Sequence, residues 1–93
     1  MFTPAARAEF LAVIQYLRLR NPQAAQRFRD HTEKTLRRLG QFPDSAQRIP
    51  EFPGLPHRQV LIEPYRFFLR QSHGELWIVA VWHGAQIPDY PAE

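Results

Sequence analysis

The chain has no cysteine, a single methionine and only four glycines among its 93 residues. Because cysteine is absent, disulfide bonds and thiolate chemistry are excluded, and nothing in the composition requires an oxidising compartment. No apolar run approaches the roughly 20 residues that a membrane-spanning helix needs. The N-terminus also lacks the basic and apolar regions of a signal peptide. We therefore expect a cytoplasmic protein with no membrane association.

Common enzyme signatures are missing as well. The sequence has no glycine-rich phosphate loop, no pair of carboxylates at a fixed short spacing and no Ser/His/Asp pattern. Its four histidines are too scattered for a metal site, so we expect no metal and no cofactor. The chain does contain 44% hydrophobic and 13% aromatic residues, which can support one compact core. A length of 93 residues then predicts a single domain over residues 1–93.

Charge is distributed unevenly along the chain. Residues 5–39 carry eight basic and three acidic side chains, a net charge of +5, whereas residues 40–93 carry four basic and six acidic ones, a net charge of −2. We interpret the basic segment as the solvated face of helices. The high isoelectric point therefore does not mark the whole molecule as a nucleic-acid binder.

Two helices are predicted in the first half of the chain. Thr3 is a suitable N-cap, and Pro4 is a suitable first helical residue. The first helix should end near Arg20, because Asn21-Pro22 disfavours helical geometry before the proline and can begin a second helix. The core-facing stripe of the first helix is expected to comprise Phe10, Val13, Ile14 and Leu17.

The second helix is predicted to run to Gly40, which should adopt the left-handed conformation of a C-terminal cap. Its buried stripe is expected to comprise Ala25, Phe28, Thr32, Leu36 and Leu39. Residues 41–56 then carry four prolines, which predict an ordered crossing loop rather than a helix or a central strand. The residues expected to fix this loop to the core are Phe42, Ile49, Phe52 and Leu55.

Three antiparallel strands are predicted next, at residues 57–63, 65–71 and 75–83. A tight hairpin should join the last two, with positive φ at Gly74. The third strand is apolar on both faces, which favours a central position in the sheet. The predicted fold class is α+β, with an N-terminal two-helix hairpin packed on a C-terminal antiparallel sheet of three strands.

The chemistry that the sequence offers lies on these strands. Arginines alternate with a phenylalanine on the middle strand, and a histidine ends the third, so these groups could meet on one face of the sheet. Such a set could cleave RNA without a metal: a general base removes the 2′-hydroxyl proton, arginines stabilise the phosphate, and an acid protonates the leaving oxygen. The candidate residues are Arg58, Tyr65, Arg66, Arg70, His83 and Tyr90.

A structural role for the same residues is the more common case. A histidine such as His83 at a strand end can bond to backbone or water, and a lone histidine rarely proves catalysis. Arg66 and Arg70 alternate as surface strand residues do, and they can form ion pairs that contribute little energy. The acidic residues available to them are Glu51, Glu63 and Glu75.

Six pieces of the sequence occur in a distinctive order and spacing. They are Phe2-Thr-Pro-Ala-Ala-Arg-Ala-Glu-Phe-Leu, Arg20-Asn-Pro-Gln-Ala-Ala-Gln-Arg-Phe, Leu39-Gly-Gln-Phe-Pro, Pro53-Gly-Leu, Pro64-Tyr-Arg-Phe-Phe-Leu-Arg and Val81-Trp-His-Gly. Together they resemble the RelE/ParE superfamily of toxins from type II toxin–antitoxin systems, over nearly the whole chain.

This resemblance implies a small domain of the predicted fold, neutralised by a cognate antitoxin whose extended or helical segment wraps it. The complex can be a higher-order toxin–antitoxin hetero-oligomer. Relatives usually have an N-terminal β-strand before the Thr-Pro-Ala-Ala piece, where this chain has only Met1-Phe2. We therefore expect the N-terminal edge strand to be short or missing.

The superfamily contains two biochemical classes. RelE-like members cut mRNA on the ribosome, and Arg66 and His83 match positions that are catalytic in some of these nucleases. ParE-like members poison DNA gyrase. Docking on ribosomal RNA should favour a strongly basic sheet face, yet residues 40–93 are net negative. The Pro53-Gly-Leu and Pro64-Tyr-Arg-Phe-Phe pieces also look more like ParE, so we favour a non-enzymatic inhibitor of DNA gyrase.

The sequence also suggests surfaces for these partners. We expect an apolar groove at Phe68 and Trp82 to bind the antitoxin. Many relatives follow His-Gly with two basic residues, where this chain has Ala85-Gln86. This departure leaves open a degenerate toxin that is kept as a binding partner. The residues expected to contact the target or phosphate are Arg58, Tyr65, Arg70 and Tyr90.

Overall fold

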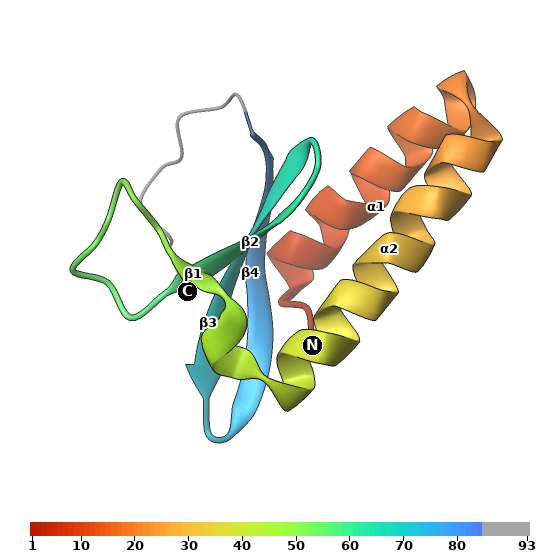
Figure 1. Ribbon diagram of the computed structural model, residues 1–93. Coiled ribbons are helices and arrows are strands. Elements are labelled where there is room, and N and C mark those ends of the chain that lie inside the picture. The colour runs from red at the N-terminus through yellow and green to blue at the C-terminus, as the bar shows by residue number, and fades with distance from the viewer. Residues whose placement is uncertain (85–93) are drawn as a thin grey trace.

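A computed structural model describes residues 1–84 as a helical hairpin packed on one face of an antiparallel sheet (Figure 1). The sheet has the order β1-β2-β3-β4, so each strand lies beside its neighbour in sequence. The predicted α+β fold is confirmed, and a short fourth strand is added to it. No helix in the described part of the chain is long and apolar enough to cross a membrane. The elements are α1 (Pro4–Arg20), α2 (Pro22–Gln41), a 3-10 turn (Pro43–Ser45), β1 (Gln47–Arg48), β2 (Arg58–Ile62), β3 (Tyr65–Ser72) and β4 (Glu75–His83).

Side-chain caps begin both helices where the sequence predicts them. The Thr3 hydroxyl accepts a hydrogen bond from the backbone N–H of Ala6 at 3.2 Å. The Asn21 side chain accepts two such bonds at the start of α2, at 3.1 and 3.2 Å. These bonds satisfy N–H groups that have no partner within the helix. The caps therefore fix the sharp reversal between α1 and α2.

The predicted left-handed cap at Gly40 is wrong, because α2 continues through this residue to Gln41. The N–H of Phe42 still donates to the carbonyl of Arg38 at 2.9 Å. The helix ends there because Pro43 follows, and the residue before a proline avoids helical geometry. Pro43 therefore sets the C-terminal end of α2.

A tight hairpin joins β3 to β4, with Ser72 opposite Glu75. Both of its central residues have positive φ, 52° at His73 and 78° at Gly74. Positive φ at both positions matches the right-handed twist of the flanking strands, and glycine adopts it without steric cost. The predicted hairpin and the positive φ of Gly74 are confirmed.

β4 carries an extra residue that explains its apolar sequence. Phe68 pairs with Ala80 and Leu69 pairs with Ile78, which leaves Val79 as a bulge. The bulge puts Ile78 and Val81, three positions apart, into the cluster beneath the helices, whereas Val79 joins a second cluster. Two apolar clusters on two faces therefore account for the continuous apolar run.

The predicted central position of this strand is wrong, since β4 is the last of the four strands. Part of its outer edge is covered by the N-terminus, where Phe2 forms a parallel bridge with Ile78. The backbone N–H of Thr3 donates to the Ile78 carbonyl at 2.9 Å, and the Ile78 N–H donates to the Met1 carbonyl at 2.7 Å. The N-terminal edge strand is thus short, as the sequence indicates.

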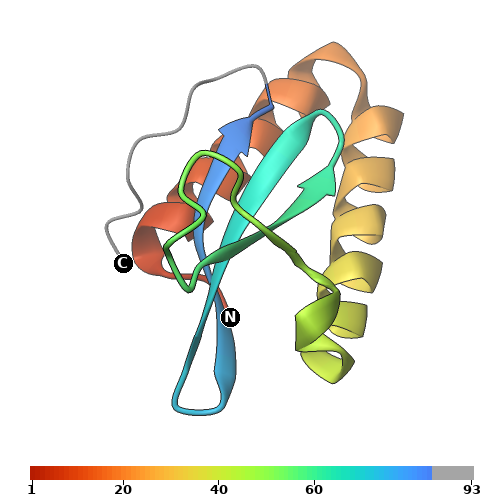
Figure 2. The same ribbon diagram turned by 60° about the vertical axis from the view of Figure 1, so that its left-hand side comes forward.

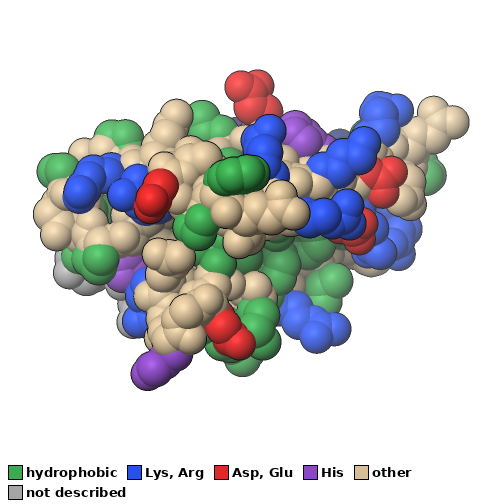
Figure 3. Space-filling view, turned by 60° about the horizontal axis from the view of Figure 1, so that its bottom comes forward, with side chains coloured by type: hydrophobic (Ala, Val, Ile, Leu, Met, Phe, Trp, Pro, Cys, Tyr) green, Lys and Arg blue, Asp and Glu red, His purple; other side chains and the backbone are tan. Residues whose placement is uncertain are grey.

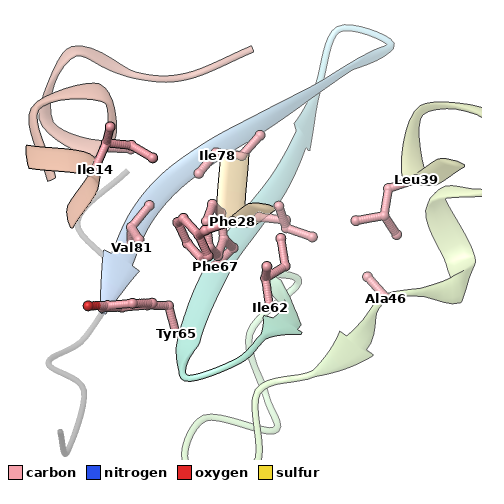
Figure 4. Close-up of a cluster of buried hydrophobic side chains, with 11 residues drawn as sticks. Ile14, Phe28, Leu39, Ala46, Ile62, Tyr65, Phe67, Ile78 and Val81 are labelled. Atoms are coloured by element: carbon pink, nitrogen blue, oxygen red, sulfur yellow. The ribbon is translucent and has the colours of Figure 1, made fainter. Parts of the chain in front are cut away.

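The main core lies between the helical hairpin and the sheet (Figure 4). Phe67 is fully buried there, and its ring centroid lies 6.1 Å from that of Phe10 and 6.2 Å from that of Phe28. Tyr65 lies at the end of this cluster (Figure 4). The predicted helical stripes are confirmed as the helical side of this core. This packing holds the hairpin against β3 and β4.

The opposite face of the sheet is covered by the loop that follows β1. Figure 2 shows this segment crossing in front of the sheet, with the helices behind it. Ile49 and Phe68 are 0% and 1% exposed, and Val79 packs with them. Phe52 packs against this cluster, but Phe42 is 62% exposed, so its predicted anchoring role is wrong. A proline-rich loop thus shields the face of the sheet that carries Arg66.

Candidate functional site

Arg66 is held in a network on the loop-covered face of the sheet. The residue is 7% exposed and lies opposite Leu61 and Trp82 on the neighbouring strands. Its Nε and Nη2 atoms donate to the side-chain oxygen of Gln59, at 2.9 and 2.6 Å. Its guanidinium also lies over the ring of Phe68, 5.1 Å from the centroid. Hydrogen bonds to Gln59 and a cation–π contact with Phe68 therefore fix the position of this cation.

Glu51 supplies the counter-charge to Arg66. The Arg66 Nη1 and Nη2 atoms donate to the two carboxylate oxygens of Glu51 at 2.9 and 2.7 Å. A guanidinium binds a carboxylate or a phosphate in this two-pronged geometry, so Glu51 uses the donors that a phosphate would need. The sequence indicates Glu51 as one possible ion-pair partner, and the structure confirms that pair. The contact of Gln59 with Arg66 was not predicted from the sequence, although the alternation of strand residues places Gln59 on the same face of the sheet as Arg66.

The pKa of Glu51 lies below its ordinary value, chiefly because Arg66 donates hydrogen bonds to the ionised carboxylate. A lowered pKa in the folded state stabilises the fold above the unfolded pKa of about 4.5, and this stabilisation is lost as the pH falls through the folded pKa. The carboxylate is 38% exposed, so solvent screens the pair. We expect the pair to contribute no more than about 1 kcal/mol.

Urea titrations of the wild type and of Glu51→Gln measure this contribution. We expect the variant to be less stable at pH 7 and the difference to shrink toward pH 3, because protonated Glu51 resembles glutamine. Glu75→Gln removes another exposed carboxylate and serves as the control. A stability difference that persists unchanged at pH 3 would contradict this assignment.

His83 does not lie beside Arg66, so the expectation that they meet on one face is wrong. His83 is directly opposite Tyr65, and their rings pack edge to face with centroids 5.5 Å apart. Tyr65 belongs to the core cluster beneath the helices, whereas Arg66 faces the loop. Adjacent strand residues point to opposite faces, so the antiparallel register puts the two candidates on different sides. Both still border a hollow of about 340 Å³ at the strand ends.

Tyr65 is 9% exposed, and burial together with the nearby charge of Tyr16 raises its pKa above the ordinary range. A phenol with a raised pKa stays protonated at neutral pH, where it can donate a hydrogen bond but is a poor base. Tyr65 and His83 also line a hollow of about 450 Å³ against α1.

Arg58 and Arg70 border the same hollow near the other end of β3. Both are half-buried and line a hollow of about 210 Å³ with residues of the turn after α2. Nη1 of Arg58 donates to the carbonyl of Ala46 at 2.9 Å, which fixes this arginine to the residue before β1. Nε of Arg70 is buried and has no hydrogen-bond partner among residues 1–84. The structure therefore does not gather the predicted arginines into one site.

The predicted antitoxin groove at Phe68 and Trp82 is filled by the chain itself. Phe68 is 1% exposed beneath Ile49, and Trp82 is half-buried at the edge of the same cluster. The burial of Phe68 was not predicted, because the sequence does not show where the proline-rich loop crosses. Tyr90 and Ala85-Gln86 lie outside the described residues.

Comparison with known families gives one match. The family described as the ParE toxin of type II toxin–antitoxin systems, parDE, has a sequence model that matches residues 1–88. No curated protein sequence matches the chain at a significant level. The matched region includes both helices and all four strands described above.

Proposed function

Because the chain belongs to the ParE toxin family of type II toxin–antitoxin systems, we propose that it is a toxin that binds and inhibits DNA gyrase. Membership of such a system implies a cognate antitoxin as a partner. In this proposal the chain acts by protein–protein contact, and the antitoxin releases the target by covering the toxin. No metal or cofactor takes part.

The observation that carries this proposal is the separation of Arg66 from His83. RNA cleavage needs a proton-transferring group and a phosphate-binding group positioned around the same phosphodiester. Here the two candidates project from opposite faces of the sheet. This arrangement supports a binding function over a nuclease function.

The electrostatics of the sheet support the same proposal. The guanidinium of Arg66 is already occupied by Glu51 and Gln59. The part of the chain that forms the sheet carries no excess of positive charge, because residues 40–84 have four basic and four acidic side chains. Phosphate contacts supply much of the affinity for RNA. A sheet without excess positive charge and with an occupied arginine favours a protein target.

A supercoiling assay with purified DNA gyrase tests the proposal. We expect a stoichiometric excess of the wild-type chain to inhibit supercoiling, and we expect His83→Ala to inhibit equally, because His83 has no proton-transfer role. Unimpaired supercoiling at a large excess of folded chain would contradict the proposal. Growth arrest after induction without the antitoxin is expected for a gyrase inhibitor and for an mRNA nuclease alike. Such an arrest would exclude a degenerate toxin.

Ribosome-dependent mRNA cleavage is the second candidate function. One observation favours it, the hollow of about 340 Å³ that Arg66 and His83 both border. The two functions differ in which process stops first after induction, DNA replication for a gyrase inhibitor and translation for a nuclease. Cleavage of ribosome-bound mRNA by the wild type but not by His83→Ala would replace the proposed function with this one.

A further inference from the structure

α1 is apolar on two opposite sides. One side faces the core through the predicted stripe of Phe10, Val13, Ile14 and Leu17. With 3.6 residues per turn, a second stripe runs along the outward side with no charged member. Its members are Pro4, Ala5, Ala8, Leu11, Ala12, Gln15, Tyr16 and Leu19.

Every residue of this second stripe, called here the outward face of α1, is exposed. Leu11, Tyr16 and Leu19 are 46%, 50% and 79% exposed. They account for three of the six large exposed hydrophobic residues in the described chain. Apart from Gln15 the stripe is apolar, and exposed apolar residues that gather on one side of a helix mark an interaction site. The outward face of α1 thus has the composition of a surface that a binding partner covers.

Arginines flank this face. Arg7 and Arg18 lie along one edge of the stripe and Arg20 along the other, where its guanidinium stacks 4.4 Å from the centroid of the Tyr16 ring. Glu9 is the only acidic residue of α1, and its carboxylate accepts a hydrogen bond from the N–H of Val81 at 3.0 Å. Lys and Arg side chains also gather over the helical half of the molecule, on the right of Figure 3. The free charge beside the face is therefore positive.

We propose that the outward face of α1 is a docking surface for the antitoxin, and that the docking segment is an amphipathic one with apolar residues flanked by Asp or Glu. A second copy of this chain is a poor occupant, because packing α1 on α1 would bring Arg7, Arg18 and Arg20 together, and like charges disfavour association. An acidic segment complements both features of the face. The inference rests on the toxin–antitoxin part of the proposed function and does not depend on gyrase as the target.

The test uses the full chain and the product of the adjacent open reading frame as the probe. In Leu11→Lys/Leu19→Lys, lysine preserves the helix but cannot enter an apolar contact. We expect affinity for that product to fall about 100-fold or more, since buried apolar anchors dominate interface energies. Leu61→Lys is the control for a new lysine at an exposed leucine, because Leu61 is 50% exposed on β2 and lies opposite Arg66, on the sheet face that the helices do not cover. Its affinity should stay close to that of the wild type.

A second pair of variants tests the charge of the partner. Arg18→Glu should weaken binding about tenfold and reduce its salt dependence, because it places a negative charge beside an acidic segment. Arg37→Glu changes the net charge equally at an exposed position on α2 and should have little effect. Equal losses in the two variants would show a general charge effect and overturn the acidic docking segment.

The remaining outcomes separate this inference from the gyrase proposal. Wild-type affinity in the double lysine variant would overturn the inference, as would failure of the wild-type chain to bind the probe. The same holds if the variant loses only self-association, or only gyrase inhibition, because the face would then belong to a second copy or to the target. Loss of antitoxin binding in a chain that never inhibits gyrase would support the docking surface and refute the gyrase target.

Discussion

Replacing Phe67 by alanine is expected to lower the free energy of unfolding by about 4 kcal/mol. The Phe67 side chain is fully buried and packs against the rings of Phe10 on α1 and Phe28 on α2. Its removal costs the transfer free energy of the ring and opens a cavity between the sheet and both helices. Loss of this packing should loosen the attachment of the helical hairpin.

Urea denaturation of the wild type, Phe67→Ala and Phe42→Ala measures this effect. Phe42 undergoes the same chemical change but is 62% exposed, so its replacement should cost less than about 0.5 kcal/mol. Comparable losses in the two variants would mean that the ring of Phe67 is not the center of the core. The contrast matters for function, because the proposed docking surface lies on α1 and depends on the attachment of that helix.

The helices follow from local chemistry, which explains why they could be predicted. Thr3 and Asn21 cap them through bonds to residues two or three positions away, and proline follows each cap. The hairpin at Gly74 is local in the same way. Features determined within a few residues are visible in one sequence, so these elements were predicted correctly.

The sheet and its site depend on pairings that the sequence does not show. β1 has only two residues and becomes a strand because Gln47 and Arg48 pair with β2. The relative side of Arg66 and His83 depends on register, and a shift of one residue would reverse it. The burial of Phe68 depends on the path of a loop from a different part of the chain. The positions of the candidate site residues therefore depend on contacts between parts of the chain that are far apart in the sequence.

The apolar outward face of α1 is visible in the sequence, although the predicted antitoxin surface was Phe68 and Trp82. Residues 10–17 contain no charged side chain on any side of the helix, whereas α2 is polar on its outer side. The core-facing stripe alone accounts for the packing of α1 on the sheet, which leaves the second stripe without a role in the core. An exposed apolar side of a helix is typical of an interaction site, which supports the docking surface proposed on α1.

Arg66→Ala is expected to lower the free energy of unfolding by about 2–3 kcal/mol, whatever the function of the residue. Gln59 is 4% exposed, and without Arg66 its side-chain oxygen would lose both donors. A buried acceptor without a partner costs more than the lost bond contributed. Glu51 is 38% exposed and can return to water, so its share of the cost is small.

This instability affects how toxicity in Arg66 variants must be interpreted. A toxin that unfolds is inactive against gyrase and against mRNA alike, so loss of toxicity in Arg66→Ala alone cannot identify a catalytic arginine. Arg66→Met/Gln59→Leu replaces the buried polar pair with apolar side chains of similar size, and removing both partners is far less costly than removing one. We expect urea denaturation to show that this double variant is more stable than Arg66→Ala, and we expect it to keep gyrase inhibition. A double variant that is as stable as the wild type but inactive would give Arg66 a direct role in the target complex or in RNA cleavage.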